Sequence, residues 1–162
     1  MPYRVFLSYT RLKDDFGAVS AFRNHLENEL RRKTGDKTLT VFQDTVEIGS
    51  GERFAERLRA ELDAAHILIV LLSPTWLKSD WCRSEYDIYR NSNPTPRPIV
   101  PILWDLVEPS RLNEDERDVY HDLVTNVQMA VWDRLQYQSW QDPQLLEATS
   151  KLAKDTAKLF PL

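Results

Sequence analysis

The segment His66-Ile67-Leu68-Ile69-Val70-Leu71-Leu72 decides the fold class of this chain. It is apolar after His66 and rich in β-branched residues, which is typical of a strand buried on both faces. Ser73-Pro74-Thr75 follows as a turn, because proline lacks the amide hydrogen that a continuing strand needs for pairing. The segment therefore predicts a central strand that ends at Leu72.

The helix expected after this turn carries an acidic and an aromatic residue on one face. Trp81 and Glu85, in Trp81-Cys82-Arg83-Ser84-Glu85, stand at positions i and i+4, which share a helical face. That face follows the carboxyl end of a central strand, where open α/β sheets bind ligands. An acid and a large aromatic residue there predict a site for a cationic or ring-bearing ligand.

Strands and helices alternate along the rest of the chain. The expected strands are residues 3–8, 38–43, 66–72 and 99–103, with a short edge strand at 135–138. The expected helices are residues 16–30, 54–62, 81–90, 114–131 and 144–160. Pro101 in the fourth strand is tolerated only where its missing N–H faces a bulge or an edge. This alternation predicts a parallel sheet with helices on both faces.

Composition excludes several classes of protein. The chain has 162 residues and a net charge of −4, whereas nucleic-acid binders usually present a basic face. Its longest apolar stretch is far below the roughly 20 residues of a membrane span, and its start lacks a signal-peptide layout. A single cysteine, Cys82, excludes an internal disulfide and fits a reducing compartment. We expect one cytoplasmic domain over residues 1–162, with an ending compatible with excision from a longer protein.

Four sequence boxes, taken in order, resemble those of Toll/interleukin-1 receptor (TIR) domains. They are residues 3–9 (YRVFLSY), 41–44 with 48–51 (VFQD, IGSG), 71–74 with 79–85 (LLSP, SDWCRSE) and 99–102 (IVPI). The resemblance covers residues 3–160 and implies a flavodoxin-like three-layer α/β fold, with a five-stranded parallel sheet of order 2-1-3-4-5. A receiver domain shares this order but needs a phosphorylatable Asp at the end of a central strand, where this chain has Leu72-Ser73-Pro74.

The TIR family contains both NAD-cleaving enzymes and non-catalytic assembly modules. In the enzymes, a catalytic glutamate stands where Glu85 does, and an aromatic residue matched by Trp81 lines the nicotinamide pocket. The resemblance implies an NAD glycohydrolase of the bacterial type, acting in defence or cell-death signalling and releasing linear or cyclic ADP-ribose. NAD is then a substrate, and no separate cofactor is expected. The alternative is a non-catalytic scaffold or decoy that acts through TIR–TIR contacts.

One carboxylate suffices for this chemistry. The nicotinamide ring nitrogen is already cationic and leaves as a neutral molecule, so no general acid is required, unlike in an ordinary glycosidase. Glu85 would stabilise the oxocarbenium-like charge at the anomeric carbon. Trp81 would stack on the pyridinium, an interaction worth roughly 0.5–2 kcal/mol. A solvated Glu85 and a Trp81 that only packs in the core remain open alternatives.

Further substrate contacts are expected where the first strand ends. The candidates are Ser8, Tyr9, Thr10, Arg11 and, after the second strand, Asp44. Arg11 would pair with a phosphate in a forked geometry, although loop arginines are usually solvated. The G-x-G-x-x-G fingerprint is absent, so NAD would bind as a substrate in an open cleft. The three histidines lie apart and without ligand spacing, and we expect no metal site.

The loop of residues 44–51 is the expected assembly segment. In the resembling family this loop reaches a neighbouring TIR domain and completes the active site. The matching residues here are Val46, Glu47, Ile48, Gly49, Ser50 and Gly51. The resemblance thus implies a homo-oligomer or filament in the active state, and an isolated domain that is nearly silent when dilute.

Overall fold

A computed structural model describes residues 2–10, 17–43, 52–125 and 129–161, with the backbone only for residues 52–54. The five strands are β1 (Arg4–Ser8), β2 (Thr40–Gln43), β3 (Ile67–Leu72), β4 (Ile99–Leu103) and β5 (Ala130–Val131). Every neighbouring pair is parallel, and the order is β2-β1-β3-β4-β5. The predicted flavodoxin-like α/β class and strand order are confirmed.

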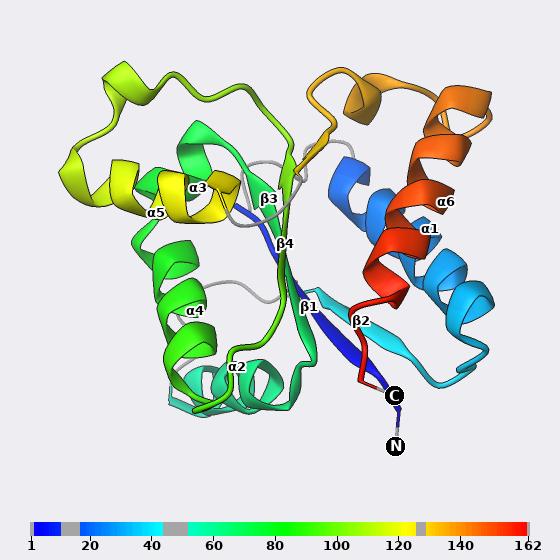
Figure 1. Ribbon diagram of the computed structural model, residues 1–162, viewed down its shortest axis with the longest axis horizontal. Coiled ribbons are helices and arrows are strands. Elements are labelled where there is room, and N and C mark those ends of the chain that lie inside the picture. Colours follow the sequence, from blue (N-terminus) through cyan, green and yellow to red (C-terminus); the bar gives the residue numbers. More distant parts are fainter. Residues whose placement is uncertain (1, 11–16, 44–51, 126–128, 162) are drawn as a thin grey trace.

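Helices form a layer on each face of the sheet (Figure 1). One layer consists of α1 (Ala18–Thr34) and α6 (Pro143–Ala157). The other contains α2 (Glu52–Ala64), α3 (Pro74–Lys78), α4 (Asp80–Asn91) and α5 (Glu114–Thr125). In the described part of the chain, short 3-10 helices at Pro109–Arg111 and Leu135–Tyr137 lie in the connections. None of the helices in the described segments is long and apolar enough to cross a membrane.

Burial of β3 on both faces explains why its sequence was so informative. Ile67, Ile69 and Leu71 pack with the apolar residues of α1 and α6. Their alternating neighbours Leu68, Val70 and Leu72 pack with those of α2 to α5. All six side chains are at most 3% exposed. The strand is therefore the centre of two hydrophobic cores, as its continuous apolar run predicts.

The predicted turn at residues 73–75 is wrong, because this segment begins helix α3. The Ser73 hydroxyl accepts a hydrogen bond from the Trp76 amide at 3.0 Å, and Pro74 occupies the first helical turn. Serine is a favoured N-cap, and proline at the first helical position loses no hydrogen bond. The same dipeptide thus ends β3 and starts the next helix.

The predicted fifth strand at residues 135–138 and the long helix at 114–131 are also wrong. Helix α5 ends at Thr125, and the fifth strand is Ala130–Val131, after which the Trp132 amide donates to the Leu103 carbonyl at 2.8 Å. Residues Leu135–Tyr137 form a 3-10 helix instead. A strand of two residues is too short to carry an alternating pattern, so sequence periodicity had nothing to detect.

Pro101 satisfies the condition expected of a proline inside a sheet. The Trp104 amide donates to Leu72 of β3, while the Leu103 carbonyl accepts from Trp132 on the β5 side. Backbone groups alternate in direction along a strand, so the nitrogen of Pro101 points towards β5. Among the described residues, β5 pairs only with the last two residues of β4, so no strand pairing is lost there at Pro101.

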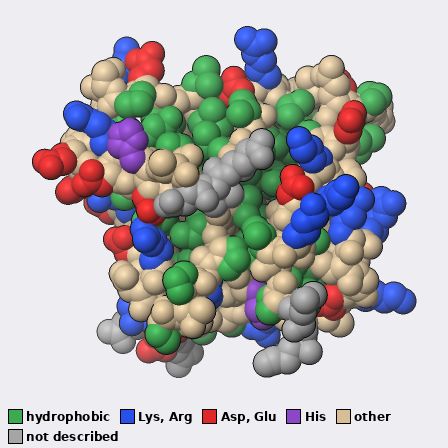
Figure 2. Space-filling view, in the orientation of Figure 1, with side chains coloured by type: hydrophobic (Ala, Val, Ile, Leu, Met, Phe, Trp, Pro, Cys, Tyr) green, Lys and Arg blue, Asp and Glu red, His purple; other side chains and the backbone are tan. Residues whose placement is uncertain are grey.

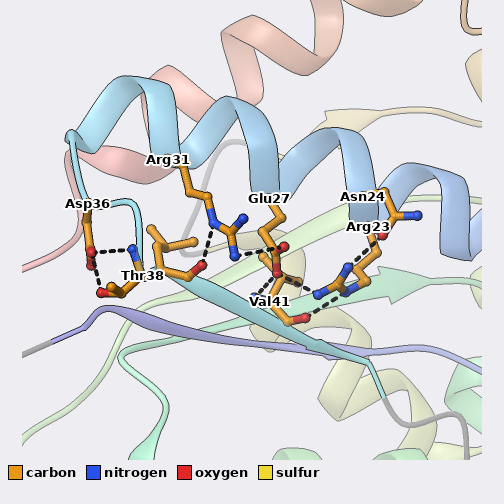
Figure 3. Close-up of polar contacts among 8 residues, drawn as sticks. Arg23, Asn24, Glu27, Arg31, Asp36, Thr38 and Val41 are labelled. Carbon is orange, nitrogen blue, oxygen red and sulfur yellow. Dashed lines mark hydrogen bonds and ion pairs between the residues drawn. The ribbon is translucent and has the colours of Figure 1, made fainter.

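The outer edge of β2 is covered by polar side chains of α1 (Figure 3). Glu27 accepts the outward-facing amide of Val41 at 2.9 Å, and Arg23 donates to the Val41 carbonyl at 2.8 Å. Arg31 donates to the Leu39 carbonyl, also at 2.8 Å. An exposed edge strand offers unpaired backbone groups to other chains, and these contacts satisfy them internally.

Candidate functional site

The candidate site lies at the carboxyl ends of β1 and β3, which are neighbours in the sheet. β1 leads into α1 on one face, whereas β3 leads into α3 and α4 on the other (Figure 1). Connections that diverge in this way open the crevice in which parallel α/β sheets bind ligands. The chain ends mark the other end of the sheet (Figure 1).

Helix α4 presents Glu85 to the end of β1. Ser79 is the N-cap of this helix, and its hydroxyl accepts a hydrogen bond from the Cys82 amide at 3.2 Å. Glu85 is only 3% exposed, and the Ser8 hydroxyl donates to its Oε1 at 3.1 Å. Burial of a carboxylate is costly unless hydrogen bonds compensate it, so this bond fixes the side chain as well as stabilising it.

A pocket of about 280 Å³ lies between α2 and α4, and both Trp81 and Glu85 line it. Its walls are largely apolar, with Leu58 from α2 and Ile88 from α4, and Arg59 is also at the lining. The predicted shared face of Trp81 and Glu85 is therefore present in the structure. The volume is just below the roughly 300 Å³ at which pockets hold a whole drug-sized ligand, so it suits one ring-bearing part of a larger molecule.

The residues after β1 are tied to the segment that follows β3. The hydroxyl oxygens of Thr10 and Thr75 are 3.3 Å apart, and the thiol of Cys82 donates to the Tyr9 carbonyl at 3.4 Å. Thr10 and Cys82 are buried, which makes Cys82 a packed residue of the core. These contacts hold the two strand ends together at the proposed crevice.

The predicted substrate contacts divide into three groups. Ser8 lies against Glu85 itself, and Thr10 lies beside the β3–α3 connection. The ring of Tyr9 packs in the cluster under α1 and α6, and its hydroxyl accepts from Gln43 at 3.2 Å, so the structure does not bring it to the pocket. Arg11, Asp44 and the assembly residues 46–51 fall outside the described residues, and their roles stay predictions.

A larger hollow, of about 590 Å³, lies along the edge of β2, away from Glu85. Its lining includes Arg4, Arg23 and Arg57, but Arg23 is already engaged by Glu27 and Val41. Among the described residues that line it, no buried carboxylate shares a helical face with an aromatic ring. We therefore place the site at the smaller pocket beside Glu85.

The comparisons with known proteins agree with the sequence boxes. A family model described as TIR domain matches residues 5–142 of this chain. The chain belongs to the TIR-domain family. A comparison with curated protein sequences finds no match.

Solved TIR structures share this fold at low sequence identity. The TIR domain of the Toll-related receptor TRR-2 from Hydra magnipapillata is 18% identical, with 95% of this chain and 97% of that chain covered and a TM-score of 0.55. The RPS4 and RRS1 TIR domain heterodimer gives 15% identity, 99% coverage of each chain and a TM-score of 0.57. The TIR domains of the activated Roq1 resistosome are 21% identical, with 93% of this chain and 83% of that chain covered and a TM-score of 0.49. At such identities the likeness shows the fold.

Trp76 lies beside this candidate site and was not singled out by the sequence patterns. It is fully buried, and its indole N–H donates to the Ser8 hydroxyl at 3.0 Å. Trp81 was predictable because it shares a helical face with an acid, whereas Trp76 stands between the predicted turn at residues 73–75 and the helix expected at 81–90, where no element was predicted. Recognising Ser73-Pro74 as a helix start would have placed Trp76 in the first turn of α3, next to the strand ends.

Proposed function

We propose that this TIR domain is an NAD glycohydrolase that cleaves the nicotinamide–ribose bond. The observation that carries the proposal is the position of Glu85, which is buried, held by Ser8 and still part of the wall of a ring-sized pocket. Trp81 lines the same pocket from the same helix. An anion and an indole around an apolar hollow match a cationic aromatic ring joined to a sugar.

Glu85 would act on the ribose as charge develops at the anomeric carbon. The C–N bond breaks with its electron pair going to the pyridinium nitrogen, so nicotinamide leaves as a neutral molecule. Water then bonds to the anomeric carbon and loses one proton, and the products are nicotinamide, ADP-ribose and H⁺. A carboxylate in a largely apolar wall stabilises the cationic transition state more strongly than it would in water.

The rest of the dinucleotide would extend from the pocket along the carboxyl ends of β1 and β3. The pocket has room for one ring-bearing unit, and open α/β sheets bind the remaining parts of such ligands in the crevice at the strand ends. Trp81 would stack on the pyridinium, with Arg11 as the expected phosphate partner.

Activation would depend on contacts between copies of this chain, in a cytoplasmic defence or cell-death response. Hydrophobic side chains gather between the two helical layers on the face shown in Figure 2. Val131 of the edge strand β5 is 56% exposed, next to a hollow of about 470 Å³ that Leu159 and Leu152 of the α6 region also line. An apolar sheet edge of this kind favours association. The RPS4–RRS1 structure is itself a heterodimer of TIR domains.

The test is release of nicotinamide from NAD, measured by chromatography at low and high protein concentration. Wild type, Glu85→Gln and the control Asp87→Asn, an exposed position on the same helix, are compared after circular dichroism has shown that each is folded. We expect release per protein to rise with concentration, to disappear in Glu85→Gln and to persist in Asp87→Asn.

Two results would contradict the proposal. Activity that survives in Glu85→Gln would place the site elsewhere. Silence of the wild type at both concentrations, with a crowding agent present as well, would favour the non-catalytic TIR module.

A further inference from the structure

We propose that Trp76 is a positioning residue for Glu85, acting through the hydroxyl of Ser8. The inference rests on the proposed function, because it concerns how the carboxylate of that site is held. Two hydrogen bonds carry it: Trp76 Nε1 to Ser8 Oγ at 3.0 Å, and Ser8 Oγ to Glu85 Oε1 at 3.1 Å. All three side chains are at most 3% exposed.

The direction of these bonds follows from the chemistry of the groups. An indole N–H only donates, so the Ser8 oxygen must accept the bond from Trp76. A serine hydroxyl has one proton, and the remaining partner is the Glu85 oxygen, which accepts in the carboxylate form. Trp76 therefore orients Ser8 so that its proton points at Glu85. Without the indole N–H, the hydroxyl is free to rotate about its C–O bond.

The indole itself has little freedom to move. The amide of Trp76 donates to the Ser73 hydroxyl at 3.0 Å, which fixes the start of α3. Its ring packs edge-on against Tyr86 of α4, with the ring centroids 6.1 Å apart and the planes at 86°. Tyr86 stands one residue after Glu85, so one side chain touches both the helix that carries the carboxylate and the serine that holds it.

Simple core packing does not explain the hydrogen bond of Trp76. Trp104 provides the comparison, since it is 1% exposed and its ring packs against those of Phe22 and Trp132. The Nε1 atom of Trp104 has no hydrogen-bond partner among the described residues. A buried indole in this protein can thus serve packing alone, and Trp76 differs by aiming its N–H at the serine of the site.

The experiment is a double-mutant cycle on nicotinamide release, with Trp76→Phe, Ser8→Ala and the double variant. Trp104→Phe is the matched control, because it removes the same bulk from the core but no bond to Ser8. We expect Trp76→Phe to lower kcat about 3- to 10-fold with KM for NAD within about twofold, and Ser8→Ala to lower kcat about 10- to 100-fold. In the Ser8→Ala background, Trp76→Phe should cause no further loss.

Each other outcome overturns a defined part of the reasoning. Equal losses from Trp76→Phe with and without the Ser8 hydroxyl, or an equal loss from Trp104→Phe, would reduce Trp76 to a packing residue while leaving the glycohydrolase intact. Silence of the wild type would overturn both proposals. If Trp76→Phe does not fold, Trp76→Met fills the same space with an adaptable side chain and takes its place in the cycle.

Discussion

Removal of the Glu27 carboxylate should destabilise the fold far more than removal of the Glu29 carboxylate on the same helix. Glu27 is 7% exposed, receives the Val41 amide and pairs with Arg23 at 2.5 Å and Arg31 at 3.1 Å. Among the described residues, Glu29 pairs only with Arg32, whose side chain is 74% exposed. Both substitutions to alanine change helix propensity alike, so the difference reports the contacts of Glu27, which Figure 3 shows.

The expected size of the difference follows from these contacts. A hydrogen bond from a buried amide to a carboxylate contributes about 1.5–3 kcal/mol. The two i,i+4 arginine pairs add about 0.3–0.5 kcal/mol each, because both arginines are partly exposed. Glu27→Ala should therefore cost about 2–4 kcal/mol, and Glu29→Ala less than about 0.5 kcal/mol. For a domain of this size, the larger loss lowers Tm by about 4–16 °C.

Urea unfolding monitored by circular dichroism measures the difference directly. The midpoint should fall in Glu27→Ala while the slope m stays constant, since the change removes a native contact without altering the surface exposed on unfolding. Equal midpoints for the two variants would refute the idea that α1 stabilises the edge of β2 through Glu27.

Two further predictions concern side chains that hold segments together away from the site. Arg97 donates to the carbonyls of Leu62 and Ala65 at the end of α2, and to that of Tyr89 near the end of α4. Because lysine cannot reproduce the planar guanidinium fork, Arg97→Lys should lower the free energy of unfolding by about 2–4 kcal/mol. Thermal unfolding measures this loss, and an unchanged Tm would contradict the role of Arg97. Hydrogen bonds from Thr38, and then from the Tyr3 amide, lower the pKa of Asp36 from 3.8 to about 2. The ionised carboxylate therefore stabilises the fold fully above about pH 4, and this stabilisation is lost as pH falls towards 2. In acid-unfolding curves, the difference in stability between wild type and Asp36→Asn should close over that range, and a difference independent of pH would exclude this role of Asp36.

Sequence predicts well those elements in which a run of consecutive apolar residues is buried. β3 has six apolar residues in a row, and both of its faces are covered. The pairing of Trp81 with Glu85 was predictable too, because spacing along a helix places them on one face and both line the pocket.

What the sequence did not reveal depends on contacts between distant segments. Trp76 acquires its polar role only because β1 places Ser8 beside it, 68 residues away in sequence. β5 is a strand only because β4 offers an unpaired edge to residues Ala130–Val131. Neither partner is visible in a local pattern, so these features follow from the tertiary arrangement.

Three glutamates carry the buried carboxylates among the described residues, and their surroundings differ in kind. Glu27 accepts a hydrogen bond from the outer edge of β2. Glu116 caps the start of α5, where it exchanges hydrogen bonds with Asn113 and pairs with Lys78 at 3.0 Å. Glu85 is bonded to Ser8 at the end of β1, yet its side chain also forms part of a pocket wall. A carboxylate whose hydrogen bonds all join parts of the fold contributes to the free energy of unfolding. A carboxylate that also faces a ligand pocket contributes in addition to the free energy of binding a cation there. Loss of the charge at Glu27 or Glu116 should therefore register in unfolding curves, and loss of the charge at Glu85 in turnover.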